Sequence, residues 1–237
     1  MPSHSTYDDD VAPSTPVDRP SRREGARPVP AGVALVGAAV FALAATVAGL
    51  LDPGYDPVRE GISALATTTA PSAAVMIGGF LALAVGTMSA GVALWRRLHG
   101  GTAGRVGAAL VLLAGAGTVV VALARQDCSE LIGACAAAER AGTLSGHHVL
   151  HQLVSLAVFV ALVTALFVLP RGLRRNEPWA RLAVGTRLSG LAALVVLAAL
   201  LSGASGDVGG LVQRVFVALV FGWPVLLAAL PGRTALP

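Results

Sequence analysis

Two histidines form the clearest chemical pattern in the chain. His147 and His151 lie four residues apart where an apolar segment begins, so in a helix their imidazoles would share one face. Such a pair can hold a divalent metal such as zinc, with Asp127 or Asp56 as a third ligand, or relay a proton. A hydrogen-bonded interfacial pair that needs no cofactor is the simpler alternative. The candidates for catalysis are therefore His147, His151, Asp127 and Ser63.

Two arginines and their neighbours are typical of anion binding. Arg59 lies in the connection after the first apolar segment, and Gln213 and Arg214 directly precede the last one. A guanidinium at such a place can snorkel, pair with a loop carboxylate, or bind an anionic head group bidentately. Asp56 can cap a short helix that follows it. The predicted binding residues are Asp56, Arg59, Gln213 and Arg214.

Both cysteines lie in one polar connection, at positions 128 and 135. A disulfide between Cys128 and Cys135 is the leading interpretation, because this connection is expected to face an oxidising compartment. Thiolate metal ligands would need Cys-x-x-Cys spacing or more sulfur atoms. A buried pair of inert thiols is the remaining alternative.

The elements that must position these residues follow from composition. The 237 residues are 55% hydrophobic and only 13% charged, whereas soluble domains carry about 25% charged residues. A spanning helix needs about 20 mostly apolar residues. Six segments meet this need: 31–51, 73–95, 106–124, 147–169, 188–204 and 215–230. We predict an all-α membrane protein with six transmembrane helices in one bundle, the last kinked at Pro224.

The distribution of arginine predicts the orientation. All 17 basic residues are arginines, and all but four fall on the side of the termini. By the positive-inside rule both termini are cytoplasmic, and an even number of spans agrees. The acidic residues outside the N-terminal tail fall mainly in the three opposite connections, which we expect to converge on one outward-facing polar site.

Three regions follow from the same composition. Residues 1–30 contain no apolar run and are expected to be a disordered cytoplasmic tail. Residues 31–230 form the six-helix domain, and residues 231–237 form a short cytoplasmic C-terminal tail. The arginines lie beside apolar segments, which argues against nucleic acid despite the net charge of +4.

Several short motifs resemble a known family. Tyr55-Asp56-Pro57-Val58-Arg59 and Ile62-Ser63-Ala64-Leu65 follow the first span, Asp127-Cys128 follows the third, Gly146-His147 opens the fourth, and Gly210-Leu211-Val212-Gln213-Arg214 opens the sixth. In this order they resemble the integral membrane proteins called domain of unknown function 998. The resemblance covers about residues 31–230. It implies a six-helix bacterial or archaeal membrane protein without an established activity.

A more distant similarity links the Ile62-Ser63 segment and Ala70-Pro71 to Frag1 and DRAM type membrane proteins, some of which are linked to lipid remodelling. Those proteins often carry an acidic residue after the serine, where this sequence has Ala64.

These observations favour a multi-pass protein of a bacterial plasma membrane that binds an anionic lipid head group or a small solute. The bilayer is the partner that the composition indicates. A lipid-modifying or hydrolytic enzyme that uses the histidine pair is one alternative. A structural or accessory subunit, with ion pairs from Arg59 to Asp127 or from Arg214 to Asp56, is the other.

Overall fold

The computed structural model describes residues 29–98, 101–129 and 133–230. Of the predicted tails, residues 1–28 and 231–237 lie outside the described residues. Within the described ranges the chain is helical and contains no strand.

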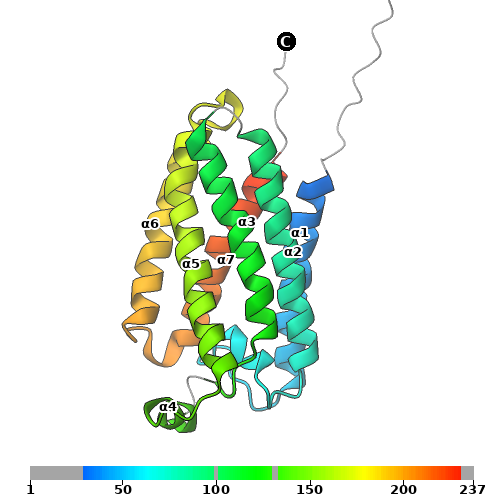
Figure 1. Ribbon diagram of the computed structural model, residues 1–237, viewed down its shortest axis with the longest axis vertical. Helices are drawn as coiled ribbons and strands as arrows, with labels where there is room; N and C mark the ends of the chain where they lie inside the picture. Colours follow the sequence, from blue (N-terminus) through cyan, green and yellow to red (C-terminus); the bar gives the residue numbers. More distant parts are fainter. Residues whose placement is uncertain (1–28, 99–100, 130–132, 231–237) are drawn as a thin grey trace, which may run out of the picture.

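Six long helices form one bundle, which confirms the predicted fold class (Figure 1). Each is long and apolar enough to cross a membrane. They are α1 (Val29–Leu51), α2 (Ala73–Arg97), α3 (Thr102–Leu123), α5 (Gly146–Leu173), α6 (Leu182–Leu201) and α7 (Gly209–Ala229). The remaining elements are short: η1 (Ile62–Ala66), α4 (Gly133–Arg140), η2 (Glu177–Trp179) and η3 (Gly206–Val208).

The last two spans begin earlier than predicted. α6 begins at Leu182 and α7 at Gly209, and α7 continues through Pro224. An uninterrupted apolar run ends at a charged side chain, but a helix does not have to, because an arginine can reach polar groups from inside its first turns. Gln213 and Arg214 therefore lie inside α7 and not before it.

Glycines bring neighbouring helices into close contact on one side of the bundle. A Cβ added to Gly37 of α1 would lie 2.7 Å from the Cα of Gly86 in α2, and one added to Gly115 of α3 would lie 2.7 Å from the backbone nitrogen of Met88 in α2. A Cβ added to Gly172 of α5 would lie still closer, 2.5 Å from the Cα of Gly104 in α3. Small residues allow backbones to approach where lipid provides no hydrophobic driving force for association.

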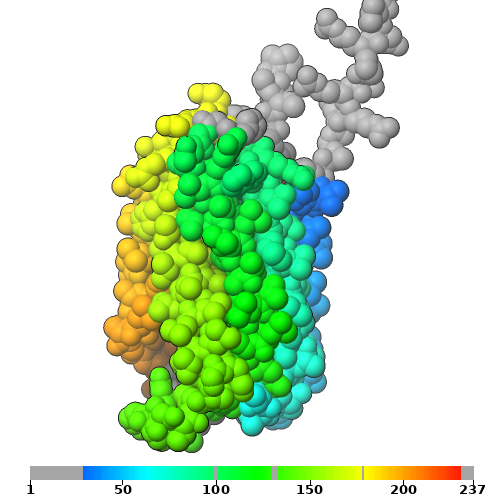
Figure 2. Space-filling model, viewed as in Figure 1, coloured from blue at the N-terminus to red at the C-terminus, as the bar shows by residue number. Residues whose placement is uncertain are grey.

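The connections from α1 to α2, from α3 to α5 and from α6 to α7 lie at the end of the bundle opposite the start of α1 and the end of α7 (Figure 1). We call this the distal end. It holds η1, η3 and α4, and α4 projects from it in the space-filling view (Figure 2). η1 packs into the bundle, with Ile62, Leu65 and Ala66 buried.

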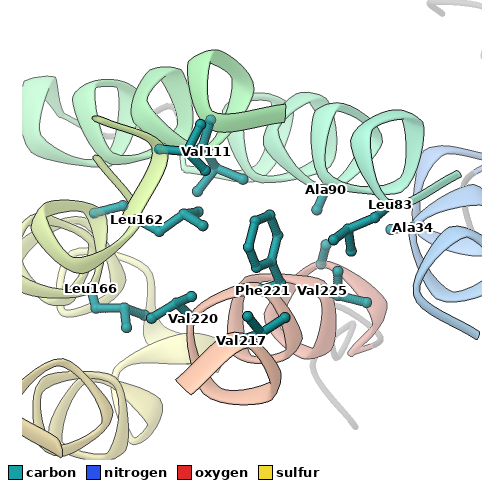
Figure 3. Packing of buried hydrophobic residues seen from close by; sticks show 14 of the residues in the cluster. Ala34, Leu83, Ala90, Val111, Leu162, Leu166, Val217, Val220, Phe221 and Val225 are labelled. Carbon is teal, nitrogen blue, oxygen red and sulfur yellow. The ribbon is translucent and has the colours of Figure 1, made fainter. Parts of the chain in front are cut away.

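The core of the bundle is made of aliphatic side chains with few aromatics. Phe221 of α7 points into the centre of the bundle, towards a space flanked by Leu83 of α2 and Leu162 of α5 (Figure 3). All three side chains belong to one buried cluster. Phe221 of α7 thus lies at the centre of the core, between side chains of α2 and α5.

Candidate functional site

Arg214 joins α7 to the connection between α1 and α2. Its Nη1 donates to the carbonyl oxygens of Pro57 at 2.6 Å, Glu60 at 3.0 Å and Gly210 at 3.0 Å, and its Nη2 donates to the Tyr55 hydroxyl. Its guanidinium carbon lies 5.5 Å from the centre of the Tyr55 ring. Burial raises the pKa of the Tyr55 phenol above its ordinary value, against the opposing effect of Arg214. The phenol oxygen accepts the hydrogen bond from Arg214.

The first turn of α7 docks on the same connection. The backbone N–H groups of Gly210 and Leu211 donate to the carbonyl oxygens of Arg59 and Val58, both at 3.0 Å. These are donors that a helix start otherwise leaves unsatisfied. The Oε1 of Gln213 accepts a hydrogen bond of 2.7 Å from the backbone of Ile62. Gln213, predicted to bind a ligand, thus positions η1.

Arg59 does not share the surroundings of Arg214. Its Nη2 pairs with Asp207 at 2.9 Å, and both side chains are largely exposed, 58% and 85%. The predicted ion pairs from Arg59 to Asp127 and from Arg214 to Asp56 are therefore wrong in their partners. Sequence spacing along separate connections carries no information about which carboxylate lies nearest in space.

Asp56 acts as the cap of a turn. Its Oδ1 accepts from the backbone of Val58 at 2.9 Å and from that of Arg59 at 3.4 Å. A short helix was expected to follow Asp56 directly, but the regular segment begins only at Ile62 as a 3-10 helix. The capping interpretation of Asp56 agrees with these bonds.

Asp127 anchors the start of α5. Its carboxylate oxygens accept from the backbone and the hydroxyl of Ser145, both at 2.7 Å. These two hydrogen bonds lower the pKa of the Asp127 carboxyl below its usual value, because they favour the charged form. Ser145 in turn caps α5 by accepting from the backbone of His148 at 3.3 Å.

The two predicted histidines have different partners. His147 is half exposed, and its Nδ1 contacts the Arg125 carbonyl and lies 3.6 Å from Asp127. His151 is buried, with 3% of its surface exposed. Its Nδ1 lies 2.8 Å from the carbonyl oxygen of Ala124 and 3.0 Å from that of Val121, at the end of α3.

The other ring nitrogen of His151 faces a serine. Its Nε2 lies 3.2 Å from the Ser63 Oγ, the side chain that η1 brings to the bundle. Carbonyl oxygens can only accept, so Nδ1 carries the proton in the neutral ring and Nε2 presents its lone pair to Ser63. The structure thus joins two of the four predicted catalytic candidates, Ser63 and His151.

Cys128 and Cys135 form the predicted disulfide. Among the described residues, the one group of three or more potential metal ligands consists of these cysteines and His148, and it does not include His147, His151 or Asp127. Disulfide sulfurs are not thiolate ligands. The Nδ1 of His148 accepts from the backbone of Asp127 at 3.1 Å, so its proton resides on Nε2, where it opposes metal binding. The residues of this group therefore do not fit a metal.

An apolar groove of about 710 Å³ lies between α1 and α7. Phe41 and Leu50 of α1 and Val217 of α7 are among its lining residues. Its polar groups are few and include the Tyr55 hydroxyl. Arg214 is the one charged residue among the described residues that line it.

A second cavity, of about 540 Å³, borders α5, α6 and α7. Its polar lining includes Ser63, His151 and Gln213, and its apolar lining includes Phe159 and Leu197. We call it the polar cavity, and the hollow between α1 and α7 the apolar groove. A small space of about 30 Å³ between them shares lining residues with both.

Sequence reasoning missed several contributors. Tyr55 stood in a quoted motif without a role, and Ser145 was not singled out, although an aromatic phenol and a Ser before a helix are both recognisable signals. His148 was given no role, but it is fully buried beside the disulfide. The burial of His148 depends on tertiary packing, which the spacing of residues along the chain does not reveal.

The comparison with known proteins identifies the family. The family model described as "Protein of unknown function (DUF998)" matches residues 35–230. The chain therefore belongs to this family, which confirms the resemblance seen in its motifs, and its six apolar helices make it an integral membrane protein. No curated protein and no solved structure matches the chain. The similarity to Frag1 and DRAM type proteins stays a prediction.

Proposed function

We propose that this member of the DUF998 family binds an anionic lipid in the apolar groove, with the head group at Arg214 and an acyl chain between α1 and α7. The observation that carries the proposal is the position of Arg214, the one charged group among the described lining residues of this groove. A single cation beside a long apolar surface matches the chemistry of an amphiphilic anion.

The guanidinium retains donors for such a ligand. Nη1 supplies the three carbonyl contacts and Nη2 the contact to Tyr55. Among the described residues Nε has no hydrogen-bond acceptor. An anionic oxygen at Nε and the second Nη2 hydrogen would complete a bidentate pair, which is stronger than a neutral hydrogen bond. Arg59, exposed and paired with Asp207, is not part of this proposed site.

The groove opens towards lipid. Ala42, Thr46 and Leu50 of α1 and Ala218 of α7 line it and are exposed. In a membrane these surfaces contact acyl chains, so a lipid can enter from the side without passing through water.

Two glycines offer a matched test. A Cβ added to Gly222, which lines the groove, meets no atom within 4 Å, and the same holds for Gly78 on an exposed face of α2. Gly222→Leu places a side chain in the groove from a Cβ that has open space around it, whereas Gly78→Leu adds the same side chain elsewhere. We expect mass spectrometry of the purified protein to find a specific anionic lipid with the wild type and Gly78→Leu but not with Gly222→Leu. Equal lipid content in all three proteins would overturn the proposal.

The orientation is part of the same proposal. We infer that the distal end faces away from the cytoplasm, because the arginines are concentrated at the other end and the disulfide requires an oxidising compartment. An Ala137→Cys variant in a Cys128→Ser, Cys135→Ser background places one exposed thiol on α4. An impermeant maleimide should label it in intact cells. Labelling only after permeabilisation would invert the orientation.

A further inference from the structure

Ser63 and His151 form a contact in the polar cavity whose chemistry differs from lipid binding in the apolar groove. We propose that Ser63 is a nucleophile, that His151 is its general base, and that the polar cavity accepts a neutral lipid carrying an ester. The observation is the 3.2 Å contact between Ser63 Oγ and His151 Nε2 beside a cavity with both polar and apolar walls.

The surroundings of His151 set its protonation state. The carbonyl oxygens of Val121 and Ala124 both lie within hydrogen-bond distance of Nδ1 and hold the proton there. Nε2 therefore remains an acceptor aimed at the serine. A serine hydroxyl is a weak nucleophile until an adjacent base accepts its proton, and a third group that orients the base completes this arrangement. Backbone carbonyls at the end of α3 take the orienting role here.

The Ser63 hydroxyl is held in place by the packing of η1. Ile62 and Leu65, on either side of Ser63 in η1, are buried, and the Ile62 backbone donates to Gln213 at 2.7 Å. Since this bond engages the Gln213 Oε1, its Nε2 amino group is the atom left to donate. Gln213 lines the same cavity as Ser63, so its amide can stabilise an oxyanion that forms there.

The lining of the cavity indicates the class of substrate. Leu156, Phe159, Leu197 and Leu200 provide an apolar wall for an acyl chain. Glu139 is the one charged residue among the described residues of the lining. An acid without a nearby lining cation disfavours anionic head groups. The cavity therefore suits an uncharged ester and differs in its ligand from the apolar groove.

The reaction is a two-step acyl transfer. The Ser63 Oγ bonds to the ester carbonyl carbon as its proton moves to His151 Nε2. The tetrahedral intermediate then expels the alcohol, which takes the proton from His151, and the acyl group remains on Ser63. Water attacks this acyl-enzyme with His151 again as base, releasing the carboxylic acid and restoring Ser63.

A fluorophosphonate probe tests the nucleophile on the purified full-length protein in detergent. An activated Ser63 attacks phosphorus and expels fluoride, and mass spectrometry of the digested protein locates the adduct. We expect labelling of the wild type at Ser63 and none of Ser63→Ala. Ser189→Ala is the matched control, because Ser189 is a buried serine that bonds to the Gly185 carbonyl in α6 and faces no histidine among the described residues, and it should label as the wild type does.

The base is tested with His151→Asn. The asparagine amide can still donate to the carbonyls at the end of α3, but it cannot accept the serine proton. We expect its labelling rate to fall by about 10²-fold or more, while its thermal unfolding stays close to that of the wild type. Labelling of Ser63→Ala at the wild-type rate, or no labelling of the folded wild type, would overturn the proposal. So would His151→Asn protein that stays folded and labels at the wild-type rate.

Discussion

The apolar groove and the polar cavity lie on opposite sides of the same two elements, yet they offer different chemistry. Arg214 of α7 and Ile62 of η1 line the groove, while their chain neighbours Gln213 and Ser63 line the cavity. Consecutive residues in a helix project about 100° apart. Adjacent residues of α7 and of η1 therefore line different hollows, the groove with a cation and the cavity with none among its described lining residues. We call α7 with η1 the partition between the groove and the cavity.

The two hollows also differ in what holds them in place. The groove side depends on a guanidinium that binds the carbonyls of one connection. The cavity side depends on the second connection, where Asp127 and Ser145 fix the start of α5 and the disulfide ties the connection to α4. The groove and the cavity therefore have separate anchoring contacts, and a substitution can perturb one without the other.

The largest effect is expected from Gly210→Ala, which breaks the partition itself. An added Cβ would lie 2.7 Å from the carbonyl carbon and 2.8 Å from the nitrogen of Glu60, and backbone cannot yield as a flexible side chain does. We expect a loss of about 3 kcal/mol or more, at the upper end for overpacking, measured as thermal unfolding in detergent. Gly222→Ala, where the space is open, should be neutral or slightly stabilising. Equal behaviour of the two variants would contradict the partition.

Arg214→Met should act on the groove side with the next largest effect. It leaves the carbonyl of Pro57 without its donor and that of Glu60 with the Tyr55 hydroxyl alone, which costs about 2 to 3 kcal/mol for hydrogen bonds to a charged group. Arg59→Met, which removes only an exposed pair, should cost less than about 1 kcal/mol. Parallel unfolding curves test both. A cost for Arg59→Met that equals the cost for Arg214→Met would refute this difference.

Reduction of the Cys128–Cys135 disulfide should affect only the cavity side. The chain-entropy relation for so short a loop gives about 2 to 3 kcal/mol. The melting temperature should fall on adding reductant, and the Cys128→Ser, Cys135→Ser variant should melt at the lower value with or without reductant. Retention of lipid by the groove should not change. A reductant effect that persists in the double variant would assign the loss to another cause.

Asp127→Asn should have the smallest effect and a distinct pH dependence. The folded pKa of Asp127 is lowered, so its contribution is present above its unfolded pKa of about 3.9 and is lost as the pH falls through the lower folded value. We expect a cost of about 1 kcal/mol at neutral pH from the weakened bonds to Ser145. The difference between variant and wild type should shrink in acid. A difference that is constant with pH would exclude this origin.

The spans were predictable because a bilayer demands long apolar runs, and four of the six predicted helices begin and end close to the observed ones. α6 and α7 began later in the prediction because Arg187 and Arg214 interrupt their apolar runs. α4 was missed, although the alanine run before Glu139 has high helix propensity. It is short and polar, and a search for membrane spans does not detect such a segment.

The site was predictable in its residue types and less so in its pairings. Ser63, His151, Gln213 and Arg214 all lie at the distal end, as expected, but in two hollows. The acceptors of Arg214 are mostly backbone carbonyls, which every residue carries and no sequence pattern marks. The contact from Ser63 to His151 depends on η1 packing inward, which spacing along the chain does not reveal.

The exposed residues along the apolar groove have a consequence for affinity. Ala42, Leu50 and Ala218 line it and are exposed, so the amphiphile proposed to bind there would exchange with the bilayer and not with dissolved monomers. Occupancy then follows the mole fraction of that lipid in the surrounding leaflet, and dilution with buffer at a fixed lipid composition leaves it unchanged. Diluting the same membranes with a second lipid would empty the groove.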